Sequence, residues 1–189
     1  ANSIWFWGAC TKPVLSSFEE KFEKKGAMVS AVDLLKGIAV GAAMTNITVE
    51  GANGGLNTNY EGKAQAAADA LLKDGFDFVY VHLEAPDEMG HQGSYERKIQ
   101  AIEYLDGRIL APLVKSLDAS GEDYRIAVLP DHPTPVRLRT HTADAVPYLI
   151  FDSRKKRQGG QIYCERTAAA SGEKIERGCE LMKVLLEQE

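Results

Sequence analysis

The stretch of sequence that decides the fold reads FDFVYVHLEAPDEMGH and spans residues 76–91. Its first half, residues 76–83, is rich in aromatic and β-branched side chains, and this composition predicts a buried strand. Its second half combines a proline, a glycine and three acidic side chains, and we expect a loop there, at the end of the strand. A polar loop that directly follows a buried strand is where chemistry is expected in a layered α/β protein.

Short β-rich runs alternate with helical patterns on both sides of this stretch. Further strands are predicted over residues 4–7, 27–30, 45–50, 125–130 and 147–151. Helices are predicted over residues 17–22, 30–42, 60–73, 95–116 and 172–187. Alternation of strands with helices predicts an α/β fold, in which a mainly parallel sheet carries helices on both faces.

Local signals refine these helices and the domain organisation. Ser30 is expected to cap the second helix, with Asp33 close to its positive end. Pro112 is expected to kink or split the fourth helix. Because the chain shows neither an internal repeat nor a linker, we expect residues 1–189 to form a single domain. Its last part, residues 154–189, is interpreted as a basic loop followed by a terminal helix.

Composition narrows the class of protein. Hydrophobic residues make up 44% and charged residues 26% of the chain, which is typical of globular proteins and argues against disorder. The net charge of −5 makes nucleic-acid binding through the overall field a poor hypothesis. No apolar run approaches the ~20 residues that a bilayer span needs, and the N-terminus has no signal-peptide pattern. The three scattered cysteines, Cys10, Cys164 and Cys179, are typical of reduced thiols, so we expect a cytoplasmic location without membrane contact.

Three of the four histidines are expected in loops after strands, close to carboxylates. His91 follows Asp87 by four residues, after the strand that ends near residue 83. His132 follows Asp131 directly, after the strand that ends near residue 129, and His141 comes nine residues later. Because the carboxyl ends of parallel strands meet at one edge of a sheet, these side chains are expected to converge there. The fourth histidine, His82, lies inside the predicted strand and is interpreted as a hydrogen-bonded sheet residue.

Aspartate and histidine together suit a divalent cation of borderline hardness. Five such ligands are too many for one open catalytic ion with three protein ligands. They suit a site with two ions ~4 Å apart, of the kind used in phosphoryl displacement. The alternative is that these residues are solvated loop or capping residues, which is the common role of a lone Asp–His pair.

Three motifs carry a resemblance to a known family. The segments EAPDEMGH (84–91), LPDHPTP (129–135) and RTHT (139–142) resemble the metal-binding signatures of cofactor-independent phosphoglycerate mutase. The branch they resemble is the archaeal-type one, within the alkaline phosphatase superfamily. The upstream segments WFWG (5–8), SAVDLLKGI (30–38) and NTNYEGKA (57–64) are similar to the same branch. The resemblance covers about residues 2 to 153, and the remainder carries no further signature.

The resemblance implies an alkaline-phosphatase-like fold and a metal-dependent isomerase of glycolysis and gluconeogenesis. That family interconverts 3-phosphoglycerate and 2-phosphoglycerate through a phosphoserine, with two divalent ions: Mn²⁺ as the first choice, Zn²⁺ or Mg²⁺ as alternatives. By motif, Asp87, His91 and His141 would hold one ion. Asp131 and His132 would hold the other ion, together with an early aspartate and the serine.

The family also places a lysine near the transferred phosphate. Lys36 is the candidate for this catalytic role, with Lys63 as a less favoured substitute, and the alternative for Lys36 is an ordinary exposed helix lysine. The family's early Asp-Gly loop, its serine motif and its inserted substrate-clamping domain have no counterpart in this sequence.

We therefore interpret the chain as the C-terminal portion of the phosphatase-like domain of a longer enzyme. We expect an incomplete sheet, no activity of the chain alone, and self-association through an exposed edge. Two alternatives remain open. One is another phosphotransferase or hydrolase of the superfamily; the other is a non-catalytic module that binds metal or a partner.

Overall fold

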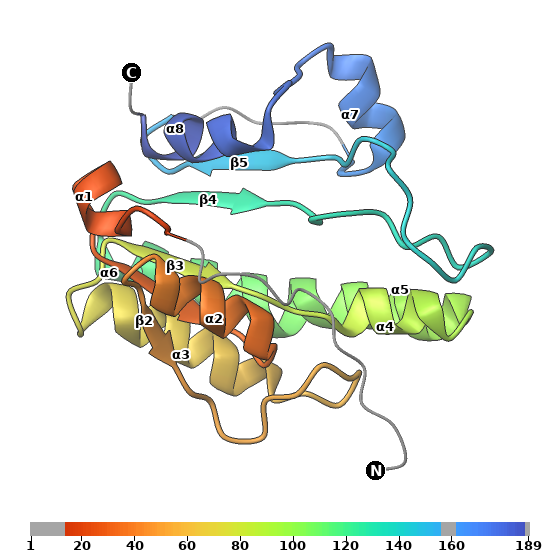
Figure 1. Cartoon of the computed structure of the whole chain (residues 1–189), viewed down its shortest axis with the longest axis horizontal. Coiled ribbons are helices and arrows are strands. Elements are labelled where there is room, and N and C mark those ends of the chain that lie inside the picture. Colours follow the sequence, from red (N-terminus) through yellow and green to blue (C-terminus); the bar gives the residue numbers. More distant parts are fainter. Residues whose placement is uncertain (1–13, 156–161, 188–189) are drawn as a thin grey trace.

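The computed structural model describes residues 14–155 and 162–187 of the chain. Figure 1 shows the arrangement of the described elements. In chain order they are α1 (Phe18–Phe22), β1 (Gly26–Val29), α2 (Asp33–Gly41), β2 (Thr45–Ile47), α3 (Tyr60–Leu72), β3 (Phe78–Val81), α4 (Ala85–His91), α5 (Tyr95–Leu105), the π-helical turn η1 (Asp106–Leu110), α6 (Ala111–Ser120), β4 (Arg125–Val128), β5 (Leu149–Asp152), α7 (Glu165–Ser171), the 3₁₀ turn η2 (Gly178–Glu180) and α8 (Leu181–Leu186).

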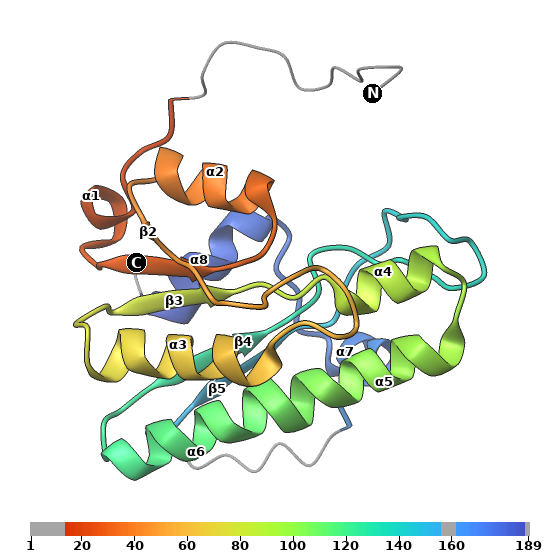
Figure 2. The ribbon, with the colours of Figure 1, turned by 90° about the horizontal axis from the view of Figure 1, so that it is seen from below.

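A three-stranded parallel sheet forms the centre of the molecule, in the order β2-β1-β3. All four residues of β1 are buried, as expected for a central strand with covered faces. The helices α2 and α3 connect the strands and lie on opposite sides of the sheet (Figure 2). The α/β class, with a parallel sheet and helices on both faces, is confirmed.

The main hydrophobic core lies between α3, α4 and the long helix that follows. Its buried side chains are Tyr60, Ala64, Ala85, Met89, Ala101 and Ile109. Alanines on one side of α3 let neighbouring backbones approach closely, while the Tyr60 ring fills the space against Tyr104, with ring centroids 5.4 Å apart. This packing fixes α4 at the carboxyl end of β3, since Ala85 and Met89 point into the core.

The helix expected over residues 95–116 is interrupted close to the predicted proline. Between α5 and α6 the backbone forms a π-helical turn, in which the N–H of Ala111 donates to the carbonyl of Asp106. Pro112, in the first turn of α6, has no N–H to donate, which is the physical reason for irregularity here. Helical geometry continues through the turn, so the two helices form one long rod (Figure 2).

The strands β4 and β5 form a separate antiparallel ladder, in which Arg125 pairs with Asp152. No ladder joins β4 to β3 among the described residues, so both strands keep an unpaired edge. The helix α8 lies alongside the β4–β5 ladder (Figure 1) and contacts β4. Arg125, on β4, donates hydrogen bonds to the carbonyls of Val184 and Leu185 at the C-terminal end of α8.

Several local predictions were wrong. Residues 85–91 form the helix α4 instead of a loop, and residues 165–171 form the unexpected helix α7. The terminal helix is confined to residues 181–186, after a 3₁₀ turn, instead of running over 172–187. Ser30 does not cap α2, because the helix begins after Val32, which occupies the N-cap position. The hydroxyl of Ser30 accepts a hydrogen bond from the N–H of Val32 instead.

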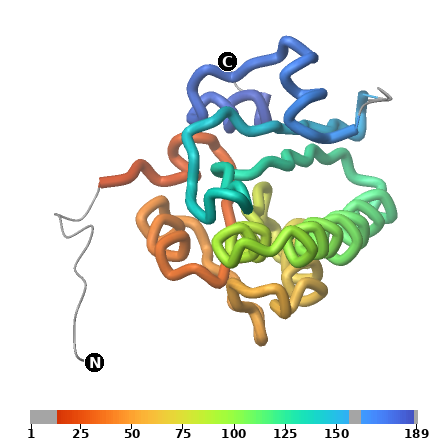
Figure 3. The backbone as a smooth tube through the Cα atoms, turned by 90° about the vertical axis from the view of Figure 1, so that its right-hand side faces the viewer, coloured from red at the N-terminus to blue at the C-terminus, as the bar shows by residue number. Residues whose placement is uncertain are grey.

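The strand predicted over residues 4–7 lies outside the described residues, as does Cys10. Among the described helices, none is both long enough and apolar enough to cross a membrane. Figure 3 shows the chain as a tube, with the C-terminal segments gathered on one side of the central sheet.

Candidate metal centre

Helix α4 presents two of the predicted ligands on one face. Pro86 occupies its first turn, where a missing N–H costs nothing, and the acidic residues Asp87 and Glu88 lie near its positive end. Because side chains four residues apart share a face of a helix, Asp87 and His91 lie together on the side opposite the core. The Nε2 of His91 is 3.3 Å from Oδ2 of Asp87.

Two glycines let the loop of residues 130–142 close onto this helix. A Cβ on Gly90 would lie 2.6 Å from the carbonyl oxygen of Thr134, so any larger residue would push the loop away. Gly93 has a φ of +73°, and a Cβ there would lie 2.4 Å from Nε of Arg139. Close approach at both positions brings the loop, and with it His141, over α4.

Asp87, His91 and His141 form a compact triad. Their ligand atoms all lie within 4.8 Å of one another. The Nε2 of His141 is 3.1 Å from Nε2 of His91 and 3.3 Å from Oδ1 of Asp87. Each side chain is between about one third and one half exposed, so the triad is open to solvent on one side.

A backbone carbonyl fixes the orientation of the His91 ring. The Nδ1 of His91 is 2.9 Å from the carbonyl oxygen of Arg139, and a carbonyl can only accept, so Nδ1 carries the hydrogen. A neutral His91 then directs the lone pair of Nε2 toward His141 and Asp87. Arg139 itself has a φ of +55°, a left-handed conformation that is uncommon outside glycine and turns its carbonyl to this task.

The second predicted pair lies next to the triad. The ring of His132 packs on the ring of His141, with centroids 3.8 Å apart. Asp131 is more exposed; its Oδ1 accepts from the N–H of His132, and its Oδ2 is 3.6 Å from Nε2 of that residue. Four of the five predicted ligands therefore belong to one connected cluster with the fifth at its rim.

Two residues that the sequence did not single out hold this cluster together. The hydroxyl of Thr134, which is buried, donates to Oδ1 of Asp87 and lies 3.3 Å from Nδ1 of His132. Lys98, on α5, donates from Nζ to the carbonyl of Thr134 at 2.6 Å. Burial lowers the pKa of Lys98, although the charge of Asp87 opposes that change. Thr134 lies inside the segment LPDHPTP, but nothing in the sequence signalled Lys98.

The predicted catalytic lysine, Lys36, forms an ion pair within its own helix. The Nζ of Lys36 is 3.2 Å from Oδ1 of Asp33 on the exposed side of α2, and no contact between Lys36 and the triad is recorded in the described part of the chain. The substitute, Lys63, is instead wholly buried.

Lys63 belongs to a buried group of charges at the junction of β3 and α4. Its Nζ donates to the carbonyl of His82 at 3.3 Å and lies 3.8 Å from Oε2 of Glu84. Burial lowers the pKa of Lys63, against the opposing influence of Glu84. Burial alone would raise the pKa of Glu84, but the His82 ring and the Lys63 charge, with the local backbone, bring it below its usual value. The side chain of His82 was expected to be hydrogen-bonded. Its Nδ1 lies 3.6 Å from Oε1 of Glu84 and has no hydrogen-bond partner within the described part of the chain.

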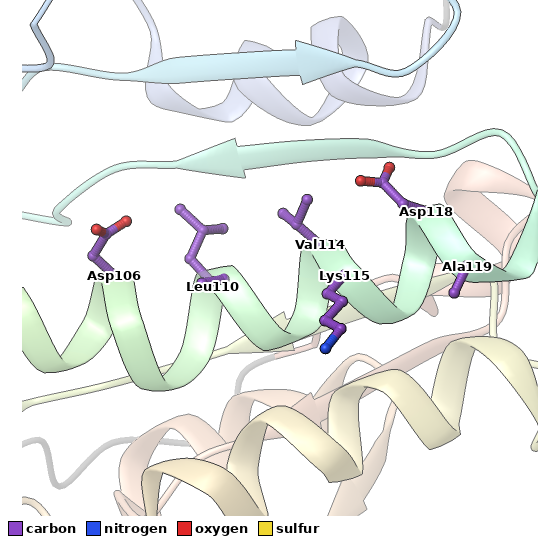
Figure 4. Close-up of a pocket in the computed structure, with 7 residues that line it drawn as sticks. Asp106, Leu110, Val114, Lys115, Asp118 and Ala119 are labelled. Carbon is purple, nitrogen blue, oxygen red and sulfur yellow. The ribbon is translucent and has the colours of Figure 1, made fainter.

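One surface hollow shares no lining residue with these groups. It is a shallow groove along one side of η1 and α6, where Asp106, Leu110, Val114 and Asp118 point toward β4 (Figure 4). It contains no histidine, so the surface depression and the candidate ligands do not coincide.

The donor set of the triad fits a single divalent cation. Two imidazole nitrogens and a carboxylate oxygen are a ligand set used by zinc and by neighbouring transition metals. The printed donor atoms of the three residues lie 3.1–3.3 Å apart in pairs, so all three side chains can reach one ion at bonding distances of about 2.0–2.2 Å. A bound cation would supply charge stabilisation for an anionic substrate, and the chain's own residues would orient the donors and leave one side open.

Comparison with known proteins agrees with this chemistry. The model of the Metalloenzyme superfamily matches residues 2–178. A probable 2,3-bisphosphoglycerate-independent phosphoglycerate mutase from Geobacter sulfurreducens is 47% identical over 189 residues, covering 100% of this chain and 47% of the relative. The 2,3-bisphosphoglycerate-independent phosphoglycerate mutase of Methanosarcina acetivorans is 49% identical over 172 residues, covering 91% of this chain and 43% of the relative. The chain thus spans about half the length of the curated relatives it matches.

Solved structures confirm the alkaline-phosphatase-like fold expected from the motifs. A protein of Pyrococcus horikoshii superposes with a TM-score of 0.81 at 33% identity, covering 90% of this chain and 50% of that one. The cofactor-independent phosphoglycerate mutase of Thermoplasma acidophilum superposes with a TM-score of 0.69 at 27% identity, covering 93% of this chain and 39% of that one. With the family match over residues 2–178, these findings confirm the resemblance that the sequence motifs indicated, and the chain belongs to the Metalloenzyme superfamily.

Proposed function

We propose that this chain is the metal-binding portion of a phosphoglycerate mutase that interconverts 3-phosphoglycerate and 2-phosphoglycerate in the cytoplasm, as a step of glycolysis and gluconeogenesis. The observation that carries the proposal is the convergence of Asp87, His91 and His141 at the carboxyl end of β3. Two named relatives that match nearly the whole chain support the choice of reaction.

The proposed centre holds two ions, with Mn²⁺ preferred over Zn²⁺ and Mg²⁺. The triad takes one ion. Asp131 and His132 take the second, a placement supported by the contact between the rings of His132 and His141. Two cations ~4 Å apart would supply charge stabilisation to a phosphoryl group whose charge spreads over three oxygens. In this proposal Lys36 approaches the phosphate after its ion pair with Asp33 opens.

The nucleophilic serine and a further aspartate come, in this proposal, from the rest of the longer polypeptide. The edges of β3 and β4 that no strand pairs with in residues 14–155 and 162–187 support the idea, because a strand from elsewhere in the protein would complete the hydrogen bonding of both. Residues 1–189 then form one part of a single phosphatase-like domain. We expect the separate 189-residue chain to turn over no substrate and to self-associate through these edges. A monodisperse monomer in sedimentation velocity would contradict the expected association.

Calorimetric titration with Mn²⁺ tests the metal centre directly. The His91→Ala variant should lose the tighter site and Asp131→Ala the second site. Asp123→Ala, which alters an exposed aspartate between α6 and β4, should bind as the unaltered chain does. If neither His91→Ala nor Asp131→Ala changes the titration, the ligand assignment fails.

A coupled assay for 2-phosphoglycerate tests the reaction. The 189-residue chain should be inactive alone, and activity should return when the remaining part of the longer protein is supplied. Turnover by the chain alone would refute the proposed division of roles.

A further inference from the structure

Thr134 contacts both groups of candidate ligands, through Asp87 in the triad and through His132 in the second pair. Its side chain is buried at 3% exposure, although the ligands around it are open to solvent. Its hydroxyl has one hydrogen, which goes to Oδ1 of Asp87. Because that hydrogen is committed, the contact of 3.3 Å with Nδ1 of His132 requires Nδ1–H to donate to the hydroxyl oxygen.

The Thr134 hydroxyl therefore sets both the orientation of the Asp87 carboxylate and the tautomer of the His132 ring. On Asp87, the donated hydrogen fixes the rotation of the carboxylate, so that Oδ2 faces His91. On His132, protonation of Nδ1 leaves Nε2 as the atom with a free lone pair. A hydroxyl so placed orients a carboxylate donor and selects an imidazole tautomer, which are the two ways in which surrounding groups tune metal ligands.

The backbone of Thr134 is held as firmly as its side chain. Lys98 reaches from α5 and donates to the Thr134 carbonyl at 2.6 Å. The absence of a side chain on Gly90 leaves room for that carbonyl against α4. The residue is therefore anchored from α4 and α5 together, and its position follows from the packed helices.

We propose that Thr134, anchored by Lys98, is a positioning residue that aligns Asp87 and His132 for cation binding and couples the two ligand groups. The inference rests on the proposed metal centre. It assigns a role to two residues outside the proposed set of ligands. Replacement of the hydroxyl should weaken cation binding without removing a ligand.

The test compares Mn²⁺ binding of the 189-residue chain and its variants by calorimetry. Thr134→Val keeps the shape of the side chain and removes the hydroxyl, and should weaken binding about 10- to 100-fold. Thr134→Ser restores the hydroxyl and should bind within about threefold of the unaltered chain, which separates hydrogen bonding from packing. Lys98→Met should weaken binding in the same direction, and it provides the measurement if Thr134→Val does not fold.

A matched control comes from another buried threonine. Thr58 is also 3% exposed, and its hydroxyl accepts a hydrogen bond from the N–H of Asn53, which is not a candidate ligand. Thr58→Val should leave the Mn²⁺ affinity unchanged. Nitrogen NMR of the metal-free protein gives an independent readout, because the His132 ring should show the Nδ1-protonated tautomer in the unaltered chain and lose that preference in Thr134→Val.

The outcomes separate this inference from the proposed function. If Asp87→Asn abolishes binding while a folded Thr134→Val binds as tightly as the unaltered chain, the positioning role is refuted and the metal centre stands. Equal weakening by Thr58→Val would also refute it, because the effect would then be general. If Asp87→Asn leaves binding intact, the metal centre itself fails and the inference falls with it.

Discussion

Removal of the buried lysine in α3 should destabilise the protein strongly. The Lys63 side chain has no exposed surface, and the Glu84 side chain is 11% exposed. Removal of one partner from a buried pair leaves an uncompensated charge and costs about 3–5 kcal/mol. For a protein of this size that loss corresponds to a fall in Tm of roughly 6–20 °C. We therefore expect Lys63→Met to lose a large fraction of its free energy of unfolding.

The assay is urea unfolding followed by circular dichroism, with a control at Lys73, the C-cap residue that directly follows the same helix. Lys73→Met removes an exposed pair, in which Nζ of Lys73 lies 2.6 Å from Oδ1 of Asp69, and should cost only about 0.3–0.5 kcal/mol. Lysine and methionine have similar helix propensities, so the difference between the two variants reports burial.

A double variant tests the cause of the destabilisation. Lys63→Met combined with Glu84→Gln removes both charges and should recover much of the lost stability, because no unpaired charge stays buried. A cost for Lys63→Met as small as that for Lys73→Met would refute the reasoning. So would a double variant no more stable than Lys63→Met alone.

Three further outcomes are expected. Gly90→Ala should weaken Mn²⁺ binding in calorimetry and lower the free energy of unfolding in urea by about 1–3 kcal/mol. Gly107→Ala, whose Cβ would meet nothing within 4 Å, should leave both unchanged. Equal effects of the two variants would contradict the close approach of the Thr134 carbonyl to Gly90. Hydrogen bonds from Arg154 lower the pKa of Asp152, and hydrogen bonds from Arg154 and Lys155 lower the pKa of Glu187 to about 2. The stabilisation from Glu187 is therefore complete above its unfolded pKa near ~4 and is lost as pH falls through about 2, and that from Asp152 is lost in the same direction, as pH falls through its own lowered pKa. NMR signals of α8 should broaden or shift between pH ~4 and about 2, and unchanged signals at pH 2 would refute the link. Mn²⁺ at 100 times its Kd should stabilise the chain by about 2.7 kcal/mol, reversed by a chelator and absent in Asp87→Asn; a thermal shift that persists in that variant would locate the ion elsewhere.

The sequence was most informative where hydrophobic patterns are long. The strands around residues 27–30, 78–81 and 125–128 and the helix of residues 60–72 were predicted from composition and period alone, within a few residues. The side of each element that faces the core carries its apolar side chains, and the spacing of those side chains can be read from the sequence. The candidate ligand residues were proposed from chemistry, since histidine is rare in this chain and occurs beside carboxylates, and the structure brings Asp87, His91 and His141 together.

The sequence was least informative where tertiary contacts decide. Pro86 and Gly90 are typical of a loop, yet α4 forms because Ala85 and Met89 find a core to pack into. A glycine that serves close approach cannot be told from one that serves a turn, because the opposing carbonyl of Thr134 lies more than forty residues away. Lys98 gave no signal, because its partner is a backbone atom.

The triad draws its members from two places in the chain, and this has a consequence for how it assembles. Asp87 and His91 are within reach of each other as soon as one short helix winds, but His141 arrives from fifty residues further along. An ion bound first by Asp87 and His91 would capture the loop of residues 130–142 when His141 reached it, after the helices and the strand between them had folded. The cation would then link α4 to the loop of residues 130–142, so the rate at which the ion dissociates would report how often that loop separates from the helix.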